Sequence, residues 1–318
     1  MKKISFLISL LLLISCDSNF DLDTGVRQEY TIDEDGDPVI ENVEDIDIHQ
    51  FGVGGGSCYG YSEPQDAEIA EIEIDTTLIL PSQYDISEYL PEVRSQGAQG
   101  SCVAWATGYY MKSFQENYES VQNGIFNSNY EMSPAYIYNQ IKVSGCGGGS
   151  FIQHALDTLV SQGIVGLDIM PYNENECDIQ PNDLQKVLAT TNKIENYFYF
   201  DEELVFDYTK ASLLNDQPVV IAVTIDRNYF GARDENGEYI YRKYKNSDGG
   251  HAMLVVGYDD DRNAFKVVNS WGKNWGNEGF VWIDYKAFQE AGDLNGDFPV
   301  LCEAWITNDV LINQPASL

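Results

Sequence analysis

The feature that most constrains the fold is a change in hydrophobic periodicity part-way along the chain. Between residues 101 and 165, apolar side chains recur at the three- and four-residue spacing of amphipathic helices. From residue 194 onward, the chain has short apolar runs such as 218–225 and 279–284, which predict β-strands. Helices first and antiparallel strands later predict an α+β fold with two lobes, and a functional site in the cleft between them.

A loop with two glycines, residues 96–101, leads into the first predicted helix. Ser101 is a favoured N-cap residue, and the apolar spacing after it predicts about four helical turns. Cys102 then lies in the first turn, where the helix dipole and unpaired N–H groups favour a thiolate, the nucleophilic form of cysteine. Gln96 can fold back over this helix end and form an oxyanion hole with the Cys102 N–H. A buried structural cysteine is the alternative.

Two further serines are placed to begin helices. Ser133 is followed by proline, a residue favoured at the first helical position, and Ser150 precedes an apolar periodic segment that ends by Gly163. We therefore expect helices to start near Ala135 and just after Ser150.

A nucleophilic cysteine needs a base, and the chain has three histidines. His49 lies in an acidic region and His154 on a predicted amphipathic helix, so neither is favoured. His251 opens the apolar run 251–258, which predicts a buried strand.

A second predicted strand, residues 264–269, follows an aspartate-rich turn. In a hairpin centred on Asp260, His251 lies opposite Asn269 to within one or two residues. Asn269 can then accept from one imidazole nitrogen while the other faces the thiol. The indole of Trp271 could shield that hydrogen bond from water.

These residues resemble the papain-like cysteine peptidases over roughly residues 79–310. The resemblance rests on residues 96–106, on the Gly-Cys-Gly-Gly-Gly block at 145–149, and on residues 251–258 with 269–272. It implies that the nucleophile is Cys102, the general base and acid His251, the orienting residue Asn269, the oxyanion glutamine Gln96, and the covering indole Trp271. It also implies that the backbones of Gly148 and Gly149 pair with an extended substrate.

Three positions depart from the family pattern. Val103 replaces the tryptophan that usually follows the nucleophile, and Gly250 replaces the aspartate that often precedes the base. Gln99 stands where the family has a cysteine, so the family's disulfide from that position to Cys146 is absent.

The N-terminus resembles a bacterial export signal. Two lysines, the apolar run 4–14 and Ser15 predict a signal peptide over residues 1–15. Residues 13–16 resemble a lipobox, which makes Cys16 the lipidated first residue of the mature protein. Ordinary signal cleavage with release is the alternative. We expect the protein at the cell envelope, outer surface or periplasm, attached to the membrane by lipid.

An acidic region, residues 16–78, separates this signal from the peptidase domain, residues 79–318. Residues 17–75 carry eighteen Asp and Glu against one Arg, which predicts a self-repelling tether. Ala70, Ile72 and Ile74 alternate with acidic residues and predict a strand with one buried face. Residues 60–78 are therefore expected to be a permanent structural element, and the enzyme to be active without their removal; an inhibitory plug is the alternative.

Four cysteines remain once Cys16 is assigned to lipid and Cys102 to chemistry. They allow three pairings, of which we favour Cys146 with Cys177 and Cys58 with Cys302; four free thiols are the alternative.

Charge and spacing exclude several other functions. The formal net charge of −33 opposes binding to nucleic acid or anionic lipid. Residues 259–261 and 293–297 are expected to be solvated turns rather than calcium sites, and cysteine and histidine do not cluster at zinc spacing. We expect neither metal nor cofactor. The basic aromatic segment 239–245 is expected to form an exposed hairpin, or else to rim the cleft.

The sequence thus predicts an exported thiol endopeptidase that acts on peptides or proteins. A catalytically silent peptide-binding module, or an amidase or transferase acting on cell-wall peptides, are the alternatives. The oligomeric state and the natural substrate are not determined by these patterns.

Overall fold

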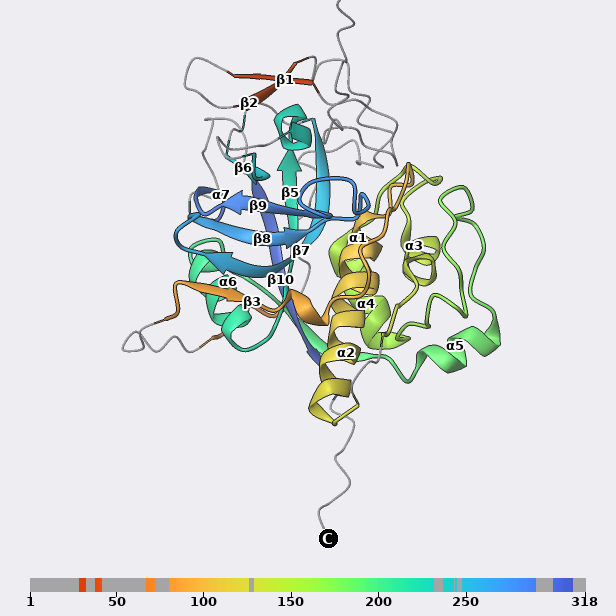
Figure 1. Ribbon diagram of the computed structural model, residues 1–318. Helices are drawn as coiled ribbons and strands as arrows, with labels where there is room; N and C mark the ends of the chain where they lie inside the picture. The colour runs from red at the N-terminus through yellow and green to blue at the C-terminus, as the bar shows by residue number, and fades with distance from the viewer. Residues whose placement is uncertain are drawn as a thin grey trace, which may run out of the picture.

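The computed structural model describes residues 29–32, 38–41, 67–72, 80–125, 129–231, 237–242, 244, 248–289 and 300–310. Helices α1 to α5 gather on one side of the molecule and most of the strands on the other, as Figure 1 shows. This arrangement confirms the predicted two-lobed α+β fold. Cys16, His49, Cys58, Ile74 and residues 293–297 lie outside the described residues.

The helical lobe is built around one continuous helix, residues 102–122. It comprises α1 (Cys102–Ala104), a π-helical segment η5 (Trp105–Lys112) and α2 (Ser113–Gln122), and is longer than the four turns predicted. The Thr107 hydroxyl donates to the Val103 carbonyl at 2.8 Å, and such bonds compete with the α-helical ladder. All residues of η5 are buried, so packing holds this wider turn in place.

Three shorter helices complete this lobe: α3 (Pro134–Ile141), α4 (Ile152–Ser161) and α5 (Asp183–Ala189). Ser133 caps α3, because its side chain accepts from the Tyr136 N–H, as predicted. The other two predicted caps are wrong. Neither α1 nor α4 has a side-chain cap, and the residue before α4 is Phe151 rather than Ser150.

The second lobe is an eight-stranded sheet in the described part of the chain, with the order β4-β10-β5-β7-β8-β9-β6 and β3 paired to β7. All its pairs are antiparallel except β6 with β9. The strands are β3 (Gln83–Asp85), β4 (Ile194–Tyr199), β5 (Val219–Ile225), β6 (Ile240–Tyr241), β7 (Gly249–Asp259), β8 (Ala264–Val268), β9 (Phe280–Asp284) and β10 (Leu301–Asp309). The short helices are η4 (Ser87–Tyr89), α6 (Val205–Leu214), η6 (Arg227–Gly231) and α7 (Lys286–Gln289).

The strand β7 lies at the contact between the lobes, where α4 with β4 and η5 with β5 also meet. Every residue of β7 is buried, and both α1 and η5 pack against it. Because both faces of β7 are buried, its sequence is continuously apolar and lacks the alternation of apolar and polar residues that a surface strand shows. The packing brings the first turn of the long helix to the start of β7, where His251 lies.

The segment 239–245 does not form an exposed hairpin. Tyr239 and Tyr241 are buried, and β6 pairs in parallel with β9. The aromatic rings of Tyr239 and Tyr241 therefore pack in the core. Their burial decides the position of the segment, although basic residues lie next to them in the sequence. Lys243 and Lys245 lie outside the described residues.

Two parts of the acidic N-terminal region are described. Strands β1 (Glu29–Ile32) and β2 (Pro38–Glu41) pair with each other, and β2 contacts η6; the tether prediction gave this stretch no secondary structure. Farther on, Ala70 is 3% exposed and its N–H donates to the Tyr199 carbonyl at 2.8 Å. Residues 67–72 thus lie along the edge strand β4. They form a single parallel bridge at Ile69, which is shorter than the strand that the sequence predicted.

No helix in the described part of the chain is long and apolar enough to cross a membrane.

Candidate active site

The candidate nucleophile lies where the predicted helix begins. Cys102 is the first residue of α1, is a free thiol and is 7% exposed. A hydrogen bond links its thiol to the backbone N–H of Ala252, the residue that follows His251. The packing of α1 against β7 therefore places the sulfur beside the start of that strand.

His251 and Asn269 form the predicted pair. The distance between His251 Nε2 and Asn269 Oδ1 is 2.7 Å, and both side chains are fully buried. His251 Nδ1 has no hydrogen-bond partner among the described residues. One imidazole nitrogen is thus held by the amide, and the other is left for proton transfer.

The backbone register behind this pair differs from the one predicted. β7 and β8 pair Leu254 with Val268, and a bulge shifts the register between Val255 and Gly257. His251 therefore lies beyond the paired part of the hairpin and has Val223 of β5 as its strand neighbour. The contact with Asn269 is a diagonal side-chain contact rather than a direct cross-strand pair.

Aromatic rings cover the imidazole. The Trp271 ring stacks on His251 with centroids 4.7 Å apart, and Phe230 stacks on Trp271 with centroids 5.0 Å apart. Tyr229 adds an edge contact to Trp271. These rings keep water from the His251–Asn269 hydrogen bond, as the sequence predicted for Trp271 alone.

The side chain of Gln96 is fixed by contacts that the sequence did not indicate. Its Nε2 donates to the Gln99 carbonyl at 2.9 Å, and its Oε1 accepts from the Ser270 hydroxyl. The Tyr172 hydroxyl donates to the Gln96 carbonyl at 2.7 Å and also bonds the Ser101 hydroxyl. Ser101 is thus engaged with Tyr172 and does not cap α1. In the sequence, only the position of Ser270 directly after Asn269 could have indicated that Ser270 belongs to the site.

Comparison with known proteins agrees with this geometry. The family described as papain family cysteine protease matches residues 80–293, more than half of the chain. The chain belongs to the papain family of cysteine proteases.

Individual relatives of this protease share both sequence and fold. A cysteine protease from Blomia tropicalis is 25% identical over 266 residues, which cover 80% of this chain and 74% of the relative. Bovine (Bos taurus) pro-cathepsin H is 27% identical over 236 residues, 71% of this chain and 67% of the relative. The crystal structure of xylellain, a cysteine protease from Xylella fastidiosa, superposes with a TM-score of 0.66 at 23% identity, covering 82% and 97% of the two chains. That likeness shows a shared fold.

Burial controls the protonation of the site in this protease. Burial raises the pKa of the Cys102 thiol. Hydrogen bonds from the backbone N–H groups of Ala252, Val103 and Cys102 itself lower that pKa, but by less. Burial lowers the pKa of His251 to about 4, against the smaller effect of the Asn269 hydrogen bond. A dry surrounding disfavours both charged forms, so the closed site favours a neutral thiol beside a neutral imidazole.

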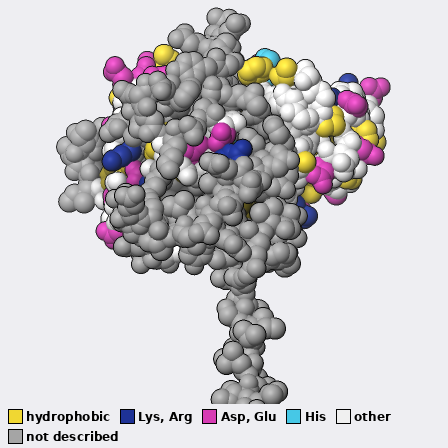
Figure 2. All heavy atoms as spheres, turned by 90° about the horizontal axis from the view of Figure 1, so that it is seen from above, with side chains coloured by type: hydrophobic (Ala, Val, Ile, Leu, Met, Phe, Trp, Pro, Cys, Tyr) yellow, Lys and Arg dark blue, Asp and Glu magenta, His cyan; other side chains and the backbone are white. Residues whose placement is uncertain are grey.

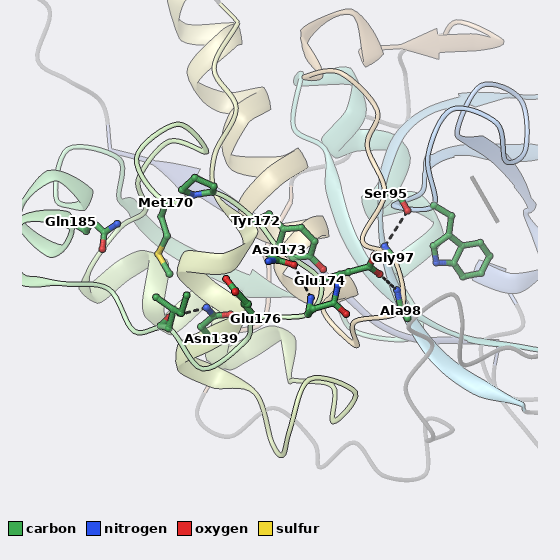
Figure 3. Close-up of a pocket in the computed structure, with 14 residues that line it drawn as sticks. Ser95, Gly97, Ala98, Asn139, Met170, Tyr172, Asn173, Glu174, Glu176 and Gln185 are labelled. Atoms are coloured by element: carbon green, nitrogen blue, oxygen red, sulfur yellow. Dashed lines mark hydrogen bonds between the residues drawn. The ribbon is translucent and has the colours of Figure 1, made fainter. Parts of the chain in front are cut away.

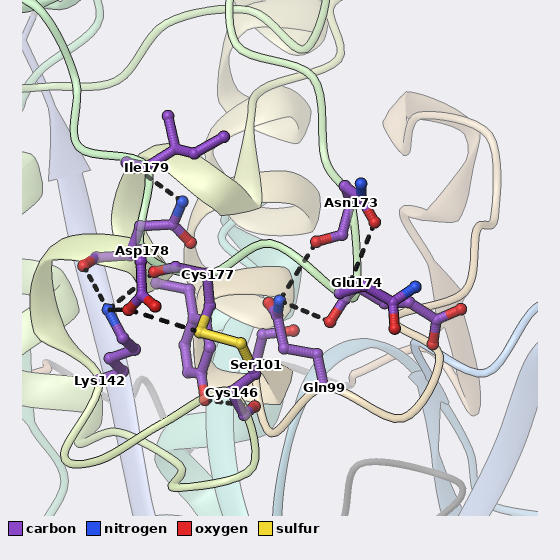
Figure 4. The surroundings of a disulfide bond; sticks show 12 residues. Gln99, Ser101, Lys142, Cys146, Asn173, Glu174, Cys177, Asp178 and Ile179 are labelled. Atoms are coloured by element: carbon purple, nitrogen blue, oxygen red, sulfur yellow. Dashed lines mark hydrogen bonds and ion pairs between the residues drawn. A yellow bond between two sulfur atoms is a disulfide. The ribbon is translucent and has the colours of Figure 1, made fainter.

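The loop opposite the nucleophile is held by a disulfide between Cys146 and Cys177, the pairing favoured from the sequence. Gln99, which stands in place of the family cysteine, donates from Nε2 to the carbonyls of Asn173 and Glu174 at 3.3 and 3.1 Å, as Figure 4 shows. An amide therefore ties the nucleophile loop to the 173–178 loop without a covalent bond. Cys302 also takes part in a disulfide, and Cys58, its predicted partner, lies outside the described residues.

The glycine block lies behind the nucleophile loop. A Cβ added to Gly148 would lie 1.8 Å from the Ser144 carbonyl oxygen, so only glycine fits there. Gly149 has a φ of +68°, which also favours glycine. A Cβ on Gly100 would lie 2.9 Å from the Gly149 backbone nitrogen, so this block packs against the loop that carries Cys102.

The remaining histidine and the acidic turn play no part in this site. His154 is exposed on α4. Asp259 bonds Arg262, and Asp260 bonds Lys210, so the turn at 259–261 is neutralised by cations of the protein. No group of three or more potential metal ligands occurs in the described part of the chain.

Proposed function

We propose that this protease is a thiol endopeptidase in which Cys102 attacks the scissile carbonyl. The observation that carries the proposal is the placement of a free, sparsely exposed thiol beside His251, whose Nε2 is held by Asn269 while Nδ1 has no partner among the described residues. This is the nucleophile, base and orienting-residue arrangement that covalent acyl transfer requires.

The reaction follows from the neutral resting pair. As the sulfur attacks the carbonyl carbon, the thiol proton passes to His251 Nδ1, and the carbonyl electrons form an oxyanion. The Gln96 amide and the Cys102 N–H would donate to that oxygen. His251 then gives the proton to the leaving amine, and a thioester remains on Cys102. Water, deprotonated by His251, attacks the thioester and releases the acid and the thiol.

Two further assignments belong to this proposal. The backbones of Gly148 and Gly149 would pair with the extended acyl half of the substrate, as the family resemblance implies, and Gly149 lies against Gly100 of the nucleophile loop. The protease would be exported and attached to a membrane through lipid on Cys16, which rests on the predicted signal peptide and lipobox.

The deciding experiment is covalent labelling with a leucyl-peptidyl epoxide, followed by mass mapping and by hydrolysis of quenched peptides. We expect one label per molecule on Cys102, and no label and no hydrolysis in Cys102→Ala. Folded wild-type protein that takes no label would instead support a silent peptide-binding cleft. Labelling without peptide hydrolysis, but with release of cell-wall peptides, would support the amidase alternative.

A further inference from the structure

A cavity borders the site at Trp271, the residue whose ring stacks on His251. It has a volume of about 1000 Å³ and reaches Ser95, Gly97 and Trp271 at one end. Because His251 protonates the leaving amine and Trp271 stacks on His251, residues after the scissile bond leave the site past Trp271. Gly148 and Gly149 are proposed to pair with the acyl half of the substrate, and neither is among the described residues that line the cavity. The cavity is therefore separate from the proposed acyl side.

The lining of this cavity is acidic. Glu174 and Glu176 both line it, as Figure 3 shows, and both belong to the 171–179 loop. No lysine or arginine is among the described residues that line it. The neutral polar lining residues are Ser95, Asn139, Tyr172, Asn173, Asn175 and Gln185. A cation that entered would thus meet two carboxylates and no competing positive charge.

The position of Glu174 is set by the nucleophile loop. Its Oε2 accepts from the Ala98 N–H at 2.7 Å, and a Cβ on Gly97 would lie 1.7 Å from the same oxygen. Gly97, with a φ of +59°, is therefore the residue that lets this carboxylate lie over the loop next to Gln96. The Gln99 amide holds the same loop through the carbonyls of Asn173 and Glu174. The Glu174 carboxylate is thus fixed against Gly97, the residue that follows the proposed oxyanion glutamine Gln96 in the chain.

We propose that Glu174 and Glu176 make this protease select lysine or arginine on the leaving-group side of the scissile bond. The inference rests on the proposed peptidase function and specifies its substrate class. A basic side chain one to three residues after the scissile bond would enter the cavity and meet the negative charge of these carboxylates. The charge of the whole chain attracts basic peptides in general, whereas this site discriminates between positions within one peptide.

The test uses quenched peptides with one common acyl half. Each pair has lysine or glutamine at the first, second or third position after the scissile bond, and kcat/KM is measured at low salt. We expect lysine to be favoured about fivefold at one position, the effect of a partly exposed ion pair. In Glu174→Gln/Glu176→Gln the ratio should fall close to one, while glutamine at residue 174 still offers an acceptor to Ala98.

The matched control is Glu202→Gln/Glu203→Gln, which removes the same charge from an exposed turn remote from the cavity lining. It should keep the wild-type ratio. A ratio of one in the wild type, or an equal ratio in the cavity variant and the wild type, would overturn the inference. An equal loss in the control would assign the preference to overall charge and overturn it too. Failure of the wild type to cleave any of the peptides would count against the peptidase function itself.

Discussion

At the residue scale, the proposed reaction passes one proton between two buried groups, the Cys102 thiol and the His251 imidazole. Cys102 and His251 lie in a dry contact between helix and strand, and burial shifts both pKa values toward the neutral forms. In the proposed reaction the thiol proton passes to the imidazole as the sulfur attacks the substrate. Asn269 holds the ring, and its hydrogen bond also opposes the lowering of the His251 pKa.

The low pKa of His251 makes stability depend on pH. Its folded-state pKa of about 4 lies below the ordinary value of 6.5, so protons bind preferentially to the unfolded chain. Its contribution is complete above pH 6.5 and is lost as the pH falls to about 4, a change of about 3 kcal/mol at about 1.4 kcal/mol per unit. Urea unfolding of wild type and His251→Gln between pH 4 and 7.5 should show a shallower decline in the variant. Parallel curves would contradict this assignment.

Ser270 is a positioning residue for Gln96. Ser270→Ala removes the hydroxyl that donates to Gln96 Oε1 and so weakens the hold on the amide, which keeps its bond to the Gln99 carbonyl. Removal of an oxyanion donor costs about 10²–10³ in rate, and a misoriented donor should cost less. We expect kcat to fall about tenfold with KM unchanged, measured on one quenched peptide.

The conservative variant Ser270→Thr keeps the hydroxyl and should recover most of that rate. If Ser270→Ala raised KM and left kcat alone, Ser270 would act on substrate binding, and the assignment to Gln96 would fail.

At the element scale, the N-terminal segment 67–72 extends the sheet. Ala70 donates to the Tyr199 carbonyl, and the Tyr199 N–H donates to the Glu68 carbonyl at 2.9 Å. These bonds cover part of the edge strand β4, and exposed edges are prone to pair with other chains. Such a contact suits a permanent part of the domain, in line with the prediction made for residues 60–78.

Removal of this segment should lower stability without activating the enzyme. We compare the mature full-length protein with a protein starting near Thr77, using one fluorogenic peptide under mild reductant. Similar kcat/KM values and a lower Tm in the truncated form are expected, because a buried alanine and two backbone hydrogen bonds are lost. A large gain in activity, reversed by the 60–78 peptide added in trans, would instead identify a latent zymogen.

At the scale of the whole molecule, the net charge is strongly negative. Figure 2 shows Asp and Glu side chains at several separate places on the described surface of the face seen from above. With a formal net charge of −33, the chain is repelled by anionic lipid headgroups. The charge therefore favours attachment through a covalent lipid, as proposed, over attachment by electrostatic attraction.

Cys16 is the residue that would carry this lipid. We expect Cys16→Ala to release the protein from membranes or to leave the precursor uncleaved, as judged by fractionation and intact mass. Wild-type protein that is wholly soluble, with an unmodified N-terminus beyond residue 16, would show that the lipobox assignment is wrong.

The sequence by itself determined the reacting groups and the order of the elements. The thiol at a helix start, the histidine that opens an apolar strand and the asparagine after the next strand were all found from local patterns. Such patterns are readable because helix caps, periodicity and turns depend on residues close together in the chain. The length of the first helix, the uncapped starts of α1 and α4 and the burial of 239–245 were missed, because packing overrides local preference there.

Only the tertiary structure decided how these groups meet. The register that pairs Leu254 with Val268 does not put His251 directly opposite Asn269, yet packing still brings their side chains together. The Ser270–Gln96 bond and the contacts of Gln99 and Glu174 join residues more than seventy positions apart. No local pattern encodes such contacts, because they depend on how the helical lobe lies against the sheet. The same packing removes water from Cys102 and His251 and thereby sets their protonation.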